Sequence, residues 1–123
     1  MKIIVVDAIP DFKDIYNAIS SKIGRDYRVV EKKEDKIELY INIDRNYKTD
    51  FSRVVFSSGN REYEKYFKDK FPGGEAIINY SYLSTKEYPT VGIELDYEYA
   101  KTEKGIDLIS DLIIKAIYEH DKT

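Results

Sequence analysis

The 123-residue chain contains neither cysteine nor tryptophan, and histidine occurs once. Without cysteine, the chain forms no disulfide, holds no thiolate-bound zinc and offers no cysteine nucleophile. The single histidine, His120, falls at the end of an expected helix, where we interpret it as a surface residue that complements the helix dipole. In that place it lacks the partners of a metal-ligand set or a catalytic triad, so serine catalysis is not expected.

Long apolar runs are also missing. None approaches the roughly 20 residues of a membrane-spanning helix, and the N-terminal MKIIVVDAIP is too short for a signal peptide. We therefore expect a cytoplasmic location. The net charge of −3 provides no basic surplus to neutralise nucleic-acid phosphates. The SSGN and PGG turns lack the glycine spacing and the lysine of a phosphate loop.

The composition that remains, 42% hydrophobic and 35% charged, is typical of a globular protein. No repeat or linker divides the chain, so residues 1–123 are predicted to form a single α/β domain. Helices are expected at 11–23, between Asn60 and Pro72, and at 103–119. The order β-α-β-β-β-α-β-β-α predicts a single mixed sheet of about six strands with three helices. The strands are expected at 3–6, 27–31, 37–43, 53–57, 76–82 and 91–97.

Two of these elements carry further information. Residues 37–43 alternate strictly between apolar and polar, which indicates a strand with one packed face. The short charged turn before it predicts an antiparallel hairpin with the strand at 27–31. The helix at 103–119, which we expect Thr102 to cap, is apolar around most of its circumference. It is therefore buried on more than one side or forms a homodimer interface.

Carboxylates are the main candidates for chemistry. Glu94, Asp96 and Glu98 share one face of the strand at 91–97, and Asp7 and Asp44 end two other strands. Parallel neighbours would gather these groups at one edge of the sheet, where they could bind a hard cation or a basic partner. An ordinary solvated acidic face explains the same pattern.

A more specific form of this hypothesis is an all-oxygen site for Mg²⁺, Mn²⁺ or Ca²⁺. Its ligands would be Asp7, Asp11, Asp44 and Glu94.

Tyrosine, in contrast, is abundant, with 12 residues. The i, i+2 pairs Tyr80/Tyr82 and Tyr97/Tyr99 would place two rings on one strand face. Such rings can stack on sugars or anchor a protein interface, although core packing explains them equally well. We take Tyr80 and Tyr82, with Asp96 and Glu98, as candidate ligand-binding residues.

Residues 82–97, YLSTKEYPTVGIELDY, resemble the closing segment of the zinc-dependent N-acetylmuramoyl-L-alanine amidases, V-L-R-N-T-K-M-P-S-V-L-V-E-L-G-F. These enzymes, which include sporulation amidases, cut the bond between the peptidoglycan glycan and its stem peptide. The match is gapless. The resemblance implies an amidase-like fold over nearly the whole chain, and it places Glu94 on the family's catalytic glutamate. The like positions are Leu83, Lys86, Pro89, Val91, Glu94 and Leu95.

The resemblance also shows what has been lost. The family binds zinc through His, Glu and His, but here Pro10 and Asp44 stand at the two histidine positions. Only Asp11 or Asp14 lies near the intervening glutamate position. Proline cannot ligate a metal, so we expect no cofactor, and zinc only if the family activity were retained.

These observations predict a degenerate amidase-like domain, a pseudoenzyme that binds a peptidoglycan fragment or a protein partner. It would meet a cell wall only if released or delivered by another route. The alternative is a small acidic interaction protein of the immunity or anti-defence type that masks a basic partner.

Overall fold

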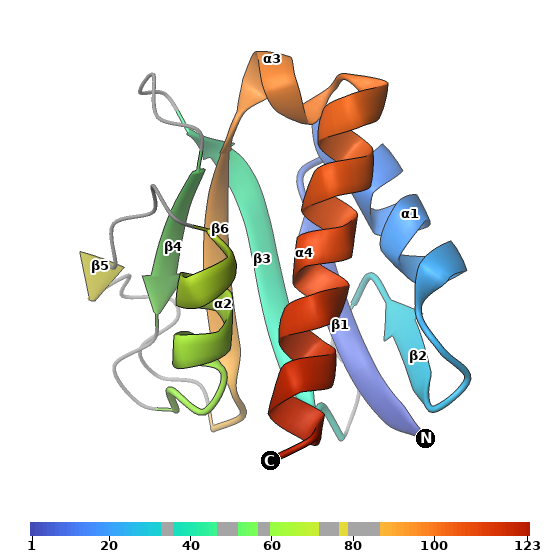
Figure 1. Ribbon diagram of the computed structural model, residues 1–123, viewed down its shortest axis with the longest axis vertical. Helices are drawn as coiled ribbons and strands as arrows, with labels where there is room; N and C mark the ends of the chain where they lie inside the picture. Colours follow the sequence, from blue (N-terminus) through green and yellow to red (C-terminus); the bar gives the residue numbers. More distant parts are fainter. Residues whose placement is uncertain (33–35, 47–51, 57–59, 72–76, 79–86) are drawn as a thin grey trace.

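The computed structural model of the chain describes residues 1–32, 36–46, 52–56, 60–71, 77–78 and 87–123 (Figure 1). Within these residues the fold is α/β, with one sheet in the strand order β2-β1-β3-β6-β4-β5. The strands are β1 (Lys2–Ala8), β2 (Tyr27–Val30), β3 (Leu39–Asn46), β4 (Ser52–Phe56), β5 (Ile77–Ile78) and β6 (Thr90–Asp96). The helices are η1 (Pro10–Phe12), α1 (Lys13–Lys22), α2 (Glu64–Lys70), α3 (Tyr97–Ala100) and α4 (Glu103–Asp121).

The sheet is mixed, because β6 pairs with β3 in parallel and with β4 in antiparallel fashion. The predicted hairpin between the second and third strands is wrong. Instead, β1 lies between β2 and β3 and runs parallel to both. The register explains how so short a connection suffices: Val30 lies beside Val5, and Leu39 lies beside Ile4. The chain thus leaves β2 at nearly the height where β3 begins.

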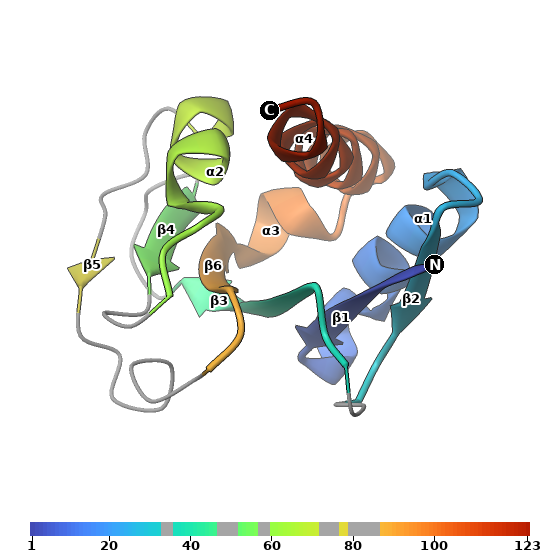
Figure 2. The same ribbon diagram turned by 90° about the horizontal axis from the view of Figure 1, so that it is seen from below.

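The helices gather on one face of the sheet, as Figure 2 shows from below. The alternation predicted for the third strand is confirmed: Leu39, Ile41 and Ile43 are fully buried, while Tyr40 and Asn42 are only partly buried. The buried face joins α1, α2 and α4 in a single core cluster. The opposite face of β3 and β6 therefore carries the polar side chains.

Helix α4 crosses the middle of the covered face, between α1 and α2 (Figure 1). Ile109, Ile113 and Ile117 are fully buried within the chain, whereas Leu108 is 42% exposed. The expectation that this helix is buried on more than one side is confirmed, and its apolar circumference requires no second copy. Its predicted cap is confirmed as well, since Thr102 Oγ1 accepts a hydrogen bond of 2.9 Å from Gly105 N–H.

The number of helices differs from the expected three, because α3 replaces the end of the predicted last strand. The strand ends at Asp96, whose carboxylate accepts a hydrogen bond of 3.0 Å from the Tyr99 N–H and so begins α3. An aspartate at a helix N-cap competes effectively with strand continuation, because it satisfies an otherwise unpaired amide.

Candidate functional site

The carboxyl ends of β1, β3 and β6 meet at one edge of the sheet. Asp44 on β3 lies directly beside Glu94 on β6, and both side chains are half-buried. A hydrogen bond of 3.2 Å from Ile9 N–H to the Ile43 carbonyl brings Pro10 to the same level. The positions that the resemblance matches to the amidase ligands and catalytic glutamate therefore do converge. We call Asp44 and Glu94 the carboxylate pair.

The other candidate metal ligands are placed differently. Asp7 lies two residues below the carboxylate pair, beside Asn42, and its carboxylate accepts a hydrogen bond from the Tyr40 hydroxyl. Asp11 is exposed on η1. Among the described residues, the group of His and Glu ligand atoms that lie within 4.8 Å of one another includes neither Asp7 and Asp11 nor the carboxylate pair. The all-oxygen site thus stays a prediction.

The predicted acidic strand face is only partly correct. Asp96 is occupied as the N-cap of α3, and Glu98 is an exposed residue of that helix rather than of the strand. Tyr97 and Tyr99 likewise lie on α3 and do not form a pair on a strand. Tyr80 and Tyr82 fall outside the described residues, so their proposed role stays a prediction.

Tyr97 nevertheless forms an aromatic and cationic cluster directly after the end of β6. The Arg45 guanidinium lies 4.3 Å from the centre of the Tyr97 ring, and the Lys101 ammonium lies 5.3 Å from it. Phe12 packs against the same ring, with 6.0 Å between ring centres. Because Arg45 directly follows Asp44 on β3, their side chains fall on opposite faces of the sheet, so this cluster is separate from the carboxylate pair.

A pocket of about 410 Å³ opens beside this edge, at the carboxyl end of β1. Because β2 ends level with Val5, no described strand pairs with the rest of β1 on that side, and the pocket occupies this space. An ion pair between Lys13 and Glu31 closes one side. The lining residues are Val6, Asp7, Ala8, Pro10, Lys13, Tyr16, Glu31 and Lys32.

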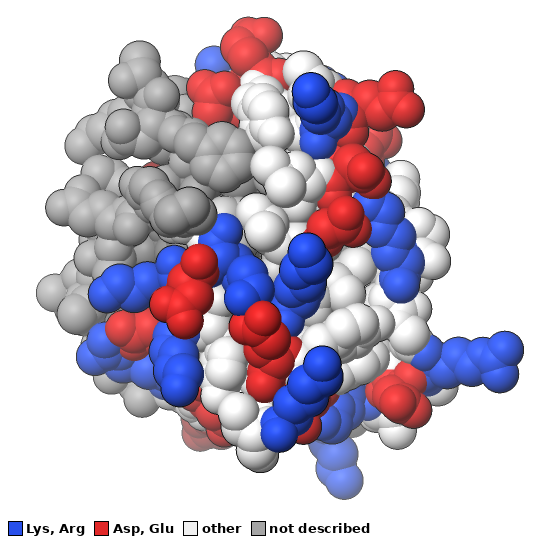
Figure 3. Space-filling view, viewed as in Figure 1, with Lys and Arg blue, Asp and Glu red and all other residues white. Residues whose placement is uncertain are grey.

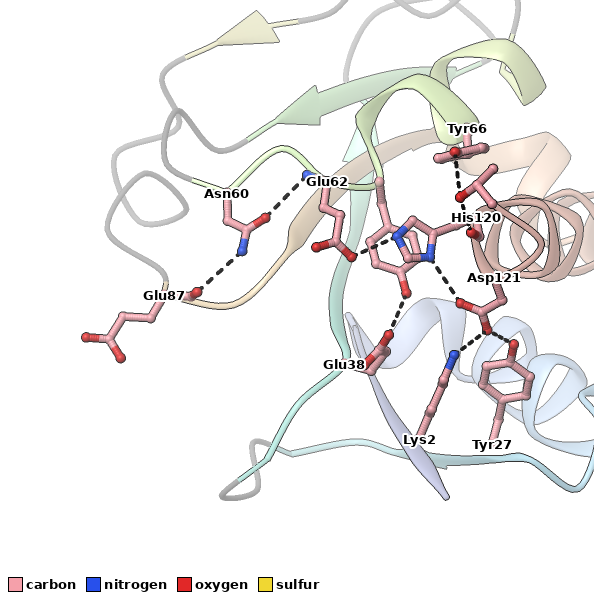
Figure 4. A network of polar contacts seen from close by, with 11 residues as sticks. Lys2, Tyr27, Glu38, Asn60, Glu62, Tyr66, Glu87, His120 and Asp121 are labelled. Atoms are coloured by element: carbon pink, nitrogen blue, oxygen red, sulfur yellow. Dashed lines mark hydrogen bonds and ion pairs between the residues drawn. The ribbon is translucent and has the colours of Figure 1, made fainter.

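At the opposite end of the molecule, the structure reveals a second polar cluster that the sequence analysis missed (Figure 4). His120 is not a lone surface residue: its side chain is only 16% exposed, and it lies 2.7 Å from Glu62 and 3.0 Å from Asp121. Its ring stacks on Tyr63, with 3.8 Å between ring centres. The Tyr63 hydroxyl donates a 3.3 Å hydrogen bond to Glu38. Burial, followed by the charge of Glu38, raises the pKa of Tyr63, so the phenol stays protonated and remains a donor.

No protein-family model and no curated protein sequence matches this chain. Solved structures do match it. The catalytic domain of CwlV, an N-acetylmuramoyl-L-alanine amidase from Bacillus (Paenibacillus) polymyxa var. colistinus, superposes with a TM-score of 0.79 at 12% identity, covering 99% of both chains. The chain has the fold of the N-acetylmuramoyl-L-alanine amidases. The fold expected from the resemblance is thus confirmed.

Two further structures with this amidase fold cover the chain almost completely. The CwlD amidase from Clostridioides difficile, in complex with the GerS lipoprotein, has a TM-score of 0.78 at 11% identity and covers 99% of both chains. Ami1 from Mycobacterium smegmatis has a TM-score of 0.73 at 12% identity, with 97% of this chain and 96% of that chain covered. None of the described helices is both long and apolar enough to cross a membrane.

The residues at the carboxyl edge do not fit the zinc that the resemblance implies. Pro10 has no donor atom, Asp44 stands at the second histidine position, and the chain has no second histidine to complete the set. The one histidine, in the last turn of α4, belongs to the other cluster. We therefore derive no catalytic step through zinc at this edge.

Proposed function

We propose that this chain is an amidase-fold domain that binds a peptidoglycan fragment without hydrolysing it. The observation that carries the proposal is the pairing of Asp44 with Glu94 at an edge where Pro10 replaces the first ligand. A glutamate at the catalytic position needs a metal-bound water to act upon. Without two imidazoles the edge keeps its shape and negative charge but not the means of activating water.

The chemistry of the edge favours a ligand that carries amino groups. Partly buried carboxylates attract ammonium groups more strongly than exposed ones do, because water screens them less. Peptidoglycan stem peptides contain such amines, and the neighbouring pocket of about 410 Å³ falls within the size range of small-ligand sites.

Binding and cleavage are separated by incubating the purified chain with muropeptides in the presence of zinc. We expect retention of muropeptides without release of stem peptide. Glu94→Gln and Asp44→Asn should each weaken retention, because each removes one charge of the carboxylate pair. The matched control is Glu103→Gln, which removes an exposed charge in the first turn of α4. Release of stem peptide by the wild-type chain would overturn the proposal that the chain does not hydrolyse its ligand. Unchanged retention of muropeptides by Glu94→Gln would overturn the assignment of the binding site to the carboxylate pair.

A protein partner is the second candidate, and one observation favours it: CwlD, which shares the fold, was solved in complex with the lipoprotein GerS. A pull-down with the chain as bait would then recover a protein, and muropeptides would not compete for it. A role in masking a basic partner gains less support. Over the described residues of the face in Figure 3, basic and acidic side chains alternate and form no patch of a single sign.

A further inference from the structure

Three side chains from distant parts of the sequence point at one another near the carboxyl end of α4 (Figure 4). Glu38 directly precedes β3, Glu62 precedes α2, and His120 lies in the last turn of α4. One ligand atom from each lies within 4.8 Å of the other two. Because Glu38 lies at the amino end of β3, this cluster is at the opposite end of the sheet from the carboxylate pair.

The histidine ring is held in a fixed orientation. Nδ1 of His120 lies 3.0 Å from Asp121 Oδ1, and the Asp121 side chain is only 14% exposed. The other oxygen of Asp121 is held by Lys2 at 3.2 Å and by the Tyr27 hydroxyl. A carboxylate that accepts a hydrogen bond from Nδ1–H favours the tautomer in which Nε2 keeps its lone pair. That is the arrangement by which metal-binding histidines are oriented in proteins.

A doubly protonated His120 between Glu62 and Asp121 would explain part of this geometry. It does not neutralise Glu38, whose carboxylate converges on the same point and accepts a hydrogen bond from the neutral Tyr63 hydroxyl rather than from the imidazole. A proton on Nε2 neutralises one carboxylate, whereas a divalent cation would neutralise both Glu38 and Glu62. Two carboxylates side by side are otherwise unfavourable through mutual repulsion.

We propose that Glu38, Glu62 and His120 bind one divalent transition-metal ion, with Nε2 of His120 as the nitrogen ligand. One imidazole and two carboxylates suit zinc or another first-row ion better than calcium or magnesium, which prefer oxygen alone. Ligand atoms around a tetrahedral zinc are about 3.4 Å apart, given bond lengths near 2.1 Å. To admit an ion, Nε2 and the Glu62 oxygen, now 2.7 Å apart, would move slightly apart, and the Glu38 carboxylate, within 4.8 Å, would move closer.

The site has room for that adjustment and a route of entry. The Glu62 side chain is 52% exposed, so its carboxylate can change rotamer. Glu38 lines a separate pocket of about 410 Å³ that it shares with Lys2 and Tyr88, among others. A bound ion would tie β3, the start of α2 and the end of α4 together. Its effect would therefore be structural, and the inference does not depend on the proposed function at the other end.

The test is calorimetric titration of metal-free protein with zinc chloride, together with thermal unfolding in zinc and in chelator. We expect one zinc per chain and a melting temperature several degrees higher with zinc. Glu38→Gln and Glu62→Gln should each weaken zinc affinity about tenfold or more. These changes preserve side-chain volume, so we expect the fold to be retained. Glu119→Gln, on the exposed side of the same helix turn, is the matched control and should leave affinity unchanged.

Nuclear magnetic resonance of the His120 ring identifies the ligand atom. We expect the Nδ1 proton to persist in the zinc-bound protein while the Nε2 resonance shifts. The proposal is overturned if the wild-type chain takes up no zinc. Equal zinc affinity in Glu62→Gln and the wild type would overturn it too.

Discussion

Of the described glycines whose surroundings are close, Gly105 leaves the least room for an alanine side chain. It lies in the first turn of α4, where that helix passes the end of α3. A Cβ at this position would lie 1.8 Å from the Tyr99 carbonyl oxygen and 3.0 Å from Thr102 Oγ1. Since side-chain carbons essentially never approach closer than 3.0 Å, the two backbones must separate by more than an ångström.

Two effects of Gly105→Ala oppose each other. Alanine is favoured over glycine inside a helix by about 1 kcal/mol. Against this, the separation removes the cap, in which Thr102 Oγ1 accepts from Gly105 N–H at 2.9 Å and donates to the Tyr99 carbonyl at 2.7 Å. Losing the cap costs about 1 kcal/mol, and the clash with backbone adds about 1–3 kcal/mol. The net expectation is a loss of about 1–3 kcal/mol in the free energy of unfolding.

Urea unfolding followed by circular dichroism measures this loss. If the free energy of unfolding depends on urea concentration with the same slope in variant and wild type, the same cooperative unit unfolds in both. Thr102→Ala should cost about 1 kcal/mol, because it removes the cap without the clash. Lys104→Ala, at an exposed position of the same turn, controls for helix propensity and should change stability little. A Gly105→Ala protein as stable as the wild type would refute the argument, since propensity would then outweigh the contact.

Two further predictions concern ion pairs and caps. Lys22 Nζ contacts Asp107 and Asp111, and the hydrogen bond to Asp107, with smaller help from Asp111, raises its pKa above 10.5. A raised pKa stabilises the fold below pH 10.5 and ceases to do so as the pH passes the folded-state value. Lys22→Met should therefore lower the free energy of unfolding by about 0.5–1 kcal/mol near neutral pH. Measured by chemical denaturation, this difference between variant and wild type should vanish at high pH. A difference that does not change with pH would contradict the argument. Asp96→Ala should cost about 1 kcal/mol through the lost cap on Tyr99 N–H, and a cost near zero in urea unfolding would show that α3 does not need it.

Much of the fold follows from local patterns. The alternation at residues 37–43 reports directly that one face of β3 is packed, and the apolar circumference of α4 reports burial on several sides. Thr102 is recognisable as a cap because its side chain acts only three residues along the chain. The likeness of residues 82–97 to the amidases indicated the architecture, which the structural comparison confirms.

Predictions from local patterns were wrong where two alternative structures of the same residues have similar local energies. Residues 96–99 alternate like a strand, but the carboxylate of Asp96 caps a helix instead. A charged turn between two extended segments predicts a hairpin between them. In the structure, however, the strand that pairs with β2 is β1 and not β3. Strand order depends on the burial of whole faces, which a short window of sequence does not contain.

The sequence alone determined that this chain has one histidine, no cysteine and a proline at the first amidase ligand position, and so no zinc set of the family's type. Only the tertiary structure decided which polar groups meet. It set Asp44 beside Glu94, as parallel register between β3 and β6 requires. It also brought His120 to Glu38 and Glu62. Contacts between residues so far apart in the chain arise from the packing of α2 and α4 on the sheet, and no spacing in the sequence encodes them.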